Sequence, residues 1–130
     1  MFRDNEAFSG FSVDDIDRAR TFYGKTLGLK VETNAMGYLE MTLGSGTKVF
    51  VYPKPNHEPA TYTMLNIVVP DIERAVDDLA AAGVGTEHYD MPDLRTDAKG
   101  IARDERGPAM AWVKDPAGNI IGIMEGRAEP

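Results

Sequence analysis

Few side chains in this chain could take part directly in catalysis or metal binding. There is no cysteine, so a thiol nucleophile and a cysteine-based zinc site are excluded. His57 and His88 are the two histidines, and neither has a partner at the spacing of a metal site, so both are interpreted as ordinary surface or edge-strand residues. Tyr52, Tyr62 and Lys48 are the available acid and base groups, and no nucleophile in the sequence pairs convincingly with them. The sequence therefore indicates no particular reaction.

The charge balance excludes two classes of partner. Asp and Glu number 21 against 14 Lys and Arg, which gives a net charge of −7. This sign opposes the counterion release that drives nucleic-acid binding, and it disfavours an anionic membrane surface. No apolar run is long enough to span a bilayer, and residues 1–7 lack the apolar segment of a signal peptide. We therefore expect a cytoplasmic protein with no nucleic-acid or membrane partner.

The chain contains an internal repeat. Asp15-Ile16-Asp17-Arg18-Ala19 recurs 56 positions later as Asp71-Ile72-Glu73-Arg74-Ala75. Each copy follows a strand-like run, residues 7–13 and 62–69, and opens a segment with apolar residues at helical spacing. The aspartate of each copy is predicted to cap its helix, and Gly28 and Gly83 are predicted to end the two helices.

Three further strands are predicted after each helix. They cover residues 29–33, 38–43 and 47–52 in the first half, and residues 85–89, 110–114 and 120–125 in the second. The order is therefore βαβββ twice, as module one (7–53) and module two (61–126) of a single domain (1–130). The proline-rich residues 53–59 join the modules, and the polar residues 92–108 are predicted to form a long loop.

Two segments of this pattern carry a resemblance to a known family. The first is residues 13–29, with Phe22-Tyr23 and Leu27-Gly28-Leu29; the second is residues 112–121, with Asp115-Pro116-Ala117-Gly118-Asn119 in its turn. Together with the repeat, they resemble the vicinal-oxygen-chelate superfamily of glyoxalase, bleomycin-resistance and dioxygenase proteins. The resemblance implies an α+β fold in which two βαβββ modules form an incomplete-barrel sheet around a lumen, with the helices on the outside.

The metal-using members of that family bind one divalent ion through a His or Gln on each module's first strand and a Glu on each last strand. The matching positions here hold Phe8 and Met64 on the first strands, and Phe50 and Gly122 on the last strands. A zinc, iron or manganese site needs three or four N, O or S donors, which these residues do not supply. We therefore expect no metal and no other cofactor.

Strand alternation extends these four positions to a set of residues predicted to line the lumen. The predicted ligand-binding set is Phe8, Ser12, Lys48, Phe50, Tyr52, Tyr62, Met64, Asn66, Trp112, Gly122 and Met124. Gly10 and Gly122 are expected to leave room beside the larger side chains. An apolar cavity with a few polar groups is typical of a small-molecule site. The alternative is that the same side chains fill the lumen as a second core.

Three classes of function follow from this pattern. The favoured one is a metal-free protein that binds a small molecule, with sequestration of a drug or metabolite as its role. The second is an enzyme that uses side chains of the same lumen in place of a metal. The third, a divalent-metal lyase, isomerase or dioxygenase, is disfavoured by the four replaced ligands. Family members of this size usually pair, so a homodimer is also expected.

Overall fold

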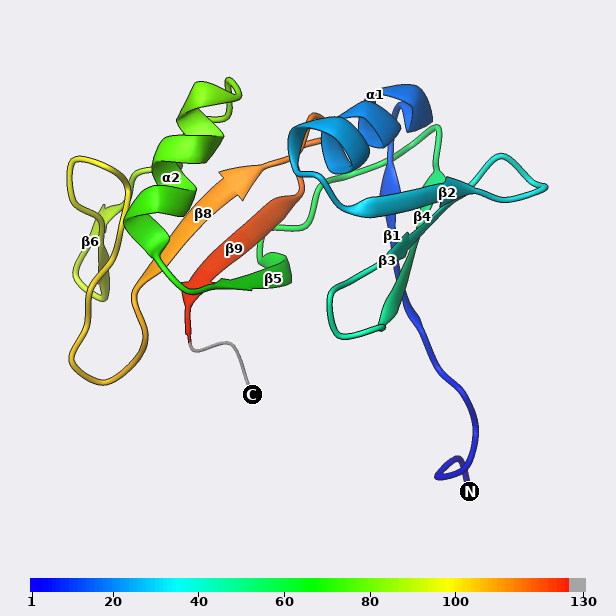
Figure 1. Ribbon diagram of the computed structural model, residues 1–130, viewed down its shortest axis with the longest axis horizontal. Helices are drawn as coiled ribbons and strands as arrows, with labels where there is room; N and C mark the ends of the chain where they lie inside the picture. Colours follow the sequence, from blue (N-terminus) through cyan, green and yellow to red (C-terminus); the bar gives the residue numbers. More distant parts are fainter. Residues whose placement is uncertain (127–130) are drawn as a thin grey trace. The chain divides into compact units, whose positions relative to one another are not determined.

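The structure is a computed structural model, which describes residues 1–126 of the 130 in the chain. The chain divides into two compact units, Met1–Pro59 (unit one) and Ala60–Pro130 (unit two). Both are mixed α+β, and their sheets are open rather than closed into a barrel, as Figure 1 shows. The α+β fold class is confirmed.

Unit one has the predicted order of elements. Its elements are β1 (Ser9–Val13), α1 (Ile16–Thr21), the π-helical turn η1 (Phe22–Thr26), β2 (Lys30–Thr33), β3 (Leu39–Thr42) and β4 (Lys48–Pro53). The strands lie in the order β1-β4-β3-β2, with β1 parallel to β4. The Asp15 side chain accepts backbone N–H groups at the start of α1, and Gly28 follows the helical segment with a φ of 72°.

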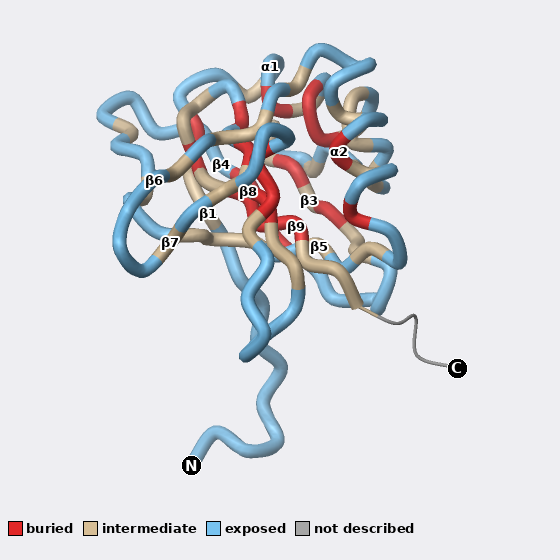
Figure 2. Tube along the Cα trace, turned by 90° about the vertical axis from the view of Figure 1, so that its left-hand side faces the viewer, coloured by how far each residue is buried: buried red, intermediate tan, exposed pale blue. Residues whose placement is uncertain are grey.

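One face of the unit one sheet packs against its helix. Val13, Leu39, Met41, Val49 and Val51 alternate along the strands and are buried. The helical segment contributes further buried side chains, namely Ala19, Phe22 and Tyr23. Figure 2 shows the buried stretches concentrated along the strands and the helices beside them. The other face of the sheet therefore carries no helix of this unit.

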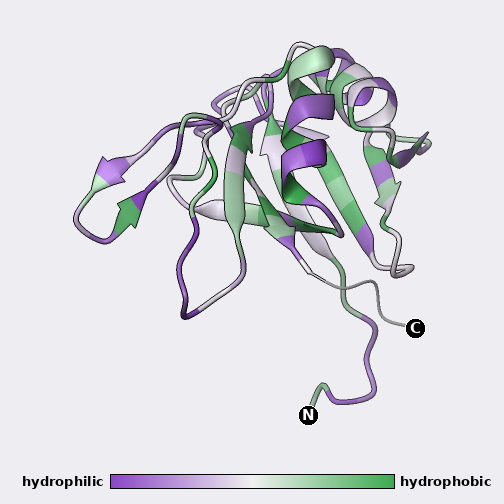
Figure 3. Ribbon diagram, turned by 60° about the vertical axis from the view of Figure 1, so that its left-hand side comes forward, coloured by the Kyte–Doolittle hydropathy of each residue, from purple (hydrophilic) through white to green (hydrophobic). Residues whose placement is uncertain are grey.

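Unit two repeats the arrangement with fewer paired strands. Its elements are β5 (Thr63–Val69), α2 (Ile72–Ala81), β6 (Asp90–Met91), β7 (Leu94–Arg95), β8 (Met110–Lys114) and β9 (Ile120–Glu125). The main sheet has the order β5-β9-β8, and β6 and β7 form a separate hairpin. Its core consists of the buried residues Ile72, Val76, Ala111, Val113, Ile121 and Ile123. The central strands are mainly hydrophobic, whereas hydrophilic residues gather on the helices and loops (Figure 3).

The prediction of a strand over residues 85–89 is wrong. This segment meets β8 through a backbone hydrogen bond from the Glu87 N–H to the Trp112 carbonyl at 2.8 Å and does not form a strand. The backbone of Tyr89 pairs instead with Thr96: the Tyr89 N–H donates to Thr96 Oγ1 at 2.9 Å, and the Thr96 N–H donates to the Tyr89 carbonyl at 3.0 Å. Because those groups are used by the hairpin region, the ladder with β8 does not continue.

The predicted loop over residues 92–108 is partly ordered by contacts with α2. Ile101 is buried, and the Lys99 ammonium lies 3.1 Å from an Asp77 carboxylate oxygen and 3.7 Å from one of Glu73. The Arg103 guanidinium lies 3.5 Å from Glu73. These ion pairs are exposed and contribute little each, so the buried Ile101 is the main anchor of the segment. Within residues 1–126, no helix has the length and apolar character that crossing a membrane would require.

Candidate functional site

The face of the unit one sheet opposite the helix is the open face of unit one. Gly10 and Ser12 of β1 lie beside Phe50 and Tyr52 of β4 in the parallel register. The intervening Phe11 points the other way, since its ring lies 5.6 Å from that of the buried Tyr23. Strand alternation therefore places these four residues together on the open face.

Aromatic rings gather on this face. The ring of Phe8, one residue before β1, lies 4.4 Å from that of Phe50 at an interplanar angle of 34°. Tyr38 and Tyr52 form a second pair with ring centroids 6.4 Å apart. Phe8 remains 66% exposed and Tyr52 39% exposed. Exposed aromatic side chains on one sheet face provide apolar surface on which a planar molecule can stack.

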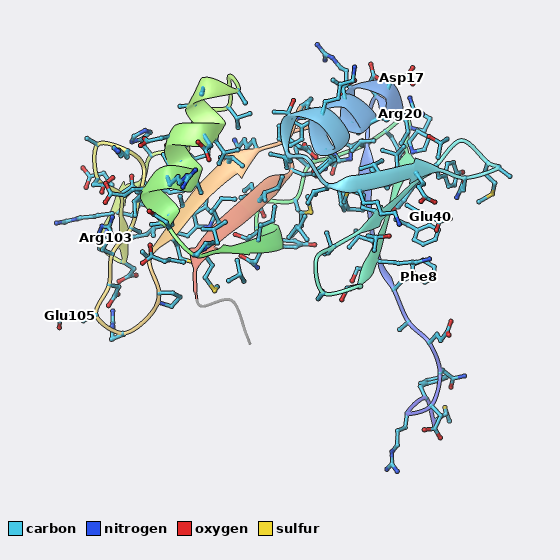
Figure 4. The ribbon with its side chains drawn as sticks, in the orientation of Figure 1. Phe8, Asp17, Arg20, Glu40, Arg103 and Glu105 are labelled. Carbon is cyan, nitrogen blue, oxygen red and sulfur yellow. The ribbon has the colours of Figure 1, made fainter. Side chains whose placement is uncertain are left out.

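Two polar pairs accompany the rings. Ser12 Oγ and His57 Nδ1 are 2.6 Å apart and partly buried. Lys48 Nζ lies 3.9 Å from a carboxylate oxygen of Glu40, the register partner of Phe50 on β3. Figure 4 shows Phe8 and Glu40 on the side of the sheet away from α1.

Sequence reasoning did not place His57 beside Ser12. It lies 45 positions from Ser12, and the two meet because the Lys54 N–H donates to the Val13 carbonyl at 2.9 Å, which extends the β1–β4 pairing. The His57 N–H then donates to the Lys54 carbonyl at 3.0 Å, so the chain turns back toward β1. The only signal available in the sequence was a turn in the proline-rich joint directly after β4.

The corresponding face of unit two, the open face of unit two, is organised around Trp112. Asn66, Gly122 and Trp112 are register partners across β5, β9 and β8, so they share this face. The indole Nε1–H donates to Thr63 Oγ1 at 3.2 Å, and the Tyr89 ring meets the indole edge-on at 5.6 Å. Trp112 therefore spans the sheet from β8 to β5, held at both sides.

A bulge interrupts the regular pairing of β5 next to Met64. The β5–β9 register shifts between Thr63 and Leu65, and Thr63 pairs with Ile120. Thr63 therefore also reaches the open face at this bulge, where its Oγ1 accepts from the Trp112 indole. Tyr62 precedes β5 and is 69% exposed. Met124 is half-buried and lies next to Val68 and Met110 on the same face as Gly122.

The two glycines of the open faces differ. A Cβ on Gly10 would meet only Phe50 within 4 Å, apart from adjoining residues, at 3.4 Å from its carbonyl oxygen and 3.9 Å from its Cβ. A Cβ on Gly122 would collide with Asn66 Oδ1 and approach Thr63 Cγ2 to 3.0 Å. The expectation of room at Gly122 is therefore wrong, because neighbouring side chains already cover it. Gly10 does have the expected space.

Comparison with known proteins identifies the family. The model of the Glyoxalase/Bleomycin resistance protein/Dioxygenase superfamily matches residues 8–123. The chain belongs to this superfamily. No curated protein matches the sequence.

Solved structures with a similar fold include a member of this superfamily. A member from Sphaerobacter thermophilus aligns with a TM-score of 0.70 and 22% identity, over 93% of this chain and 98% of that one. TnmS3, an antibiotic-binding protein from a Streptomyces species, aligns with a TM-score of 0.65 and 21% identity, over 95% and 98%. The fosfomycin resistance protein FosX from Listeria monocytogenes aligns with a TM-score of 0.69 and 11% identity, over 95% and 94%.

The superfamily metal does not fit the residues of this chain. Phe8, Phe50 and Gly122, at three of the four matching positions, have no donor atom in their side chains, and the thioether of Met64 is a soft, weak ligand. Within the described residues, no three His, Cys, Asp or Glu side chains are grouped closely enough to hold an ion. A divalent ion beside the Phe8–Phe50 pair would gain no protein ligand from either ring.

Proposed function

We propose that this superfamily member binds an aromatic small molecule without a divalent metal, and that its role is to sequester a drug or metabolite. The observation that carries the proposal is the open face of unit one, where the Phe8–Phe50 and Tyr38–Tyr52 pairs stand beside a few polar groups. An apolar surface with a small number of placed polar groups is typical of ligand sites.

Three features of the chain support this proposal. Phe8 is two-thirds exposed although its ring contacts Phe50, so one side of the ring is open to solvent. The replaced metal positions remove the ligands that a metal-dependent reaction would use. TnmS3 shows that a protein of this fold can bind an antibiotic.

The direct test is a thermal-shift screen of planar aromatic compounds with the purified full chain. A ligand that binds only the folded state raises the melting temperature, and at 100 times its Kd it adds about 2.7 kcal/mol to the free energy of unfolding. We expect compounds with two or more fused rings to give such a shift. A broad screen in which no compound raises the melting temperature would contradict the proposal.

Two phenylalanine variants locate the binding surface. Phe2 and Phe8 are both exposed, at 75% and 66%, and the Phe8 ring contacts Phe50 on the open face. We expect Phe8→Ala to weaken binding of the screened compounds about tenfold, the size of one lost aromatic contact. Phe2→Ala is the matched control and should bind as the wild type does. Equal affinities of the two variants would mean that the ligand does not use this face.

A further inference from the structure

Three residues of different chemistry, Phe8, Gly10 and Ser12, lie in line along the first strand of unit one and the residue before it. Phe8, Gly10 and Ser12 alternate along the chain, so they follow one another on the open face at about 7 Å intervals. The Phe8 ring lies on Phe50, Gly10 has no side chain, and Ser12 is hydrogen-bonded to His57. An aromatic surface and a polar pair therefore flank a residue that leaves the sheet uncovered.

Few atoms lie close to the position that a Cβ on Gly10 would take. Phe50 supplies the nearest atoms to a Cβ built there, apart from adjoining residues, at 3.4 and 3.9 Å, which are ordinary contact distances. A flat ring system can thus approach Gly10 with one edge toward Phe8 and Phe50. The distance of about 13 Å from Phe8 to Ser12 suits a molecule of two fused rings with one polar substituent.

The charges around Phe8, Gly10 and Ser12 indicate which substituent a bound ligand can carry. Glu40 is the register partner of Phe50 on the same face, its carboxylate lies 3.9 Å from Lys48, and the chain carries a net charge of −7. Because Lys48 and Glu40 neutralise each other, no unpaired positive charge beside Phe50 favours an anionic substituent. A neutral hydroxyl has one proton and two lone pairs, so it can both donate to and accept from the Ser12–His57 pair. The imidazole can donate or accept at Nδ1 according to its tautomer.

We propose that Ser12 and His57 are the polar anchor of an aromatic-ligand site on the open face of unit one, and that this site selects ligands carrying a phenolic hydroxyl. The inference rests on the proposed function and specifies its ligand class. His57 was interpreted from the sequence as an ordinary surface residue, and the 2.6 Å hydrogen bond to Ser12 gives it this role.

The test compares 2-naphthol with 2-methoxynaphthalene by isothermal titration calorimetry on the full chain. The ether keeps the two rings and the oxygen but cannot donate a hydrogen bond. We expect the wild type to bind 2-naphthol about three- to tenfold more tightly, the range that one hydrogen bond provides. Ser12→Ala and His57→Leu should reduce the preference to about onefold while the ether affinity stays near that of the wild type.

Two further variants distinguish loss of the Ser12 hydroxyl from a change in the fold. Ser12→Thr keeps the hydroxyl and should retain the preference for 2-naphthol. Ser9→Ala is the matched control, because Ser9 pairs with the buried Val49 and so lies on the opposite face of β1. If Ser12→Ala failed to fold by far-UV circular dichroism, His57→Leu would provide the same comparison.

The outcomes distinguish this inference from the proposed function. If the wild type bound both compounds equally, or if the preference survived both Ser12→Ala and His57→Leu, the anchor role of Ser12 and His57 would be wrong. Binding of aromatic compounds would remain supported in that case. Failure of both compounds to bind the wild type would overturn the proposed function, and the anchor with it.

Discussion

Replacement of Gly122 by alanine tests the packing of the open face of unit two. Gly122 lies on β9 between Asn66 of β5 and Trp112 of β8. The absence of a side chain there lets the Trp112 indole reach across the sheet to donate to Thr63 Oγ1 at 3.2 Å. An alanine Cβ would collide with Asn66 Oδ1 and lie 3.0 Å from Thr63 Cγ2.

The expected loss of stability depends on which neighbouring side chain can move. Asn66 is exposed, so its amide can rotate toward solvent at small cost. Thr63 cannot withdraw without disturbing its hydrogen bond with Trp112, and a carbon pair at 3.0 Å is inside the optimal separation of about 3.5–4.0 Å. Overpacking of this kind costs about 1–3 kcal/mol. At about 4 °C per kcal/mol for a domain of this size, Gly122→Ala should lower the melting temperature by about 4–12 °C.

Gly10→Ala is the matched control for this substitution. Its new Cβ would meet Phe50 atoms at 3.4 and 3.9 Å, and Gly10 does not have a positive φ. We expect it to leave the free energy of unfolding unchanged or to raise it by about 0.4–1 kcal/mol, because alanine restricts the unfolded chain. Thermal and urea unfolding followed by the emission of Trp112, the only tryptophan, measure both variants. A Gly122→Ala protein as stable as Gly10→Ala would refute this account of the sheet face.

Three further predictions concern acid stability, metal content and assembly. The backbone N–H of Ile101, and then that of Lys99, lower the pKa of Asp97 by hydrogen bonding to its carboxylate. Its stabilising contribution is therefore present above about pH 4 and is lost as the pH falls through the folded-state pKa. Asp97→Asn should reduce the fall in the free energy of unfolding, measured with urea, on the acid side, and an unchanged pH dependence would count against this. Elemental analysis should find no stoichiometric divalent metal, and about one removable ion per chain would show that other residues form a site. Light scattering should give twice the 14.2 kDa mass of one chain, and a monomer at micromolar concentration would exclude the homodimer.

The repeat in the sequence predicted much of the fold. Asp15 and Asp71 cap α1 and α2, and the parallel register pairs Gly10 with Phe50 in unit one and Asn66 with Gly122 in unit two, again 56 positions apart on the first strands. Capping and alternation are local properties of the chain, so they can be read from residue types alone.

The parts that sequence reasoning missed depend on contacts between distant segments. The bulge that brings Thr63 onto the open face is decided by pairing with β9, and the absence of the predicted strand over residues 85–89 follows from the bonds between Tyr89 and Thr96. The covering of Gly122 likewise comes from a side chain on another strand, that of Asn66. No periodicity within one segment carries this information.

The measurement that tests the central claim most directly is an NMR titration of the full chain with a compound that raises its melting temperature. Small-molecule binding at the open face of unit one predicts amide shift changes that saturate with ligand and are largest in β1 (Ser9–Val13), β4 (Lys48–Pro53) and His57. Changes confined to α1 and the loops, or no saturable change for any such compound, would contradict the claim.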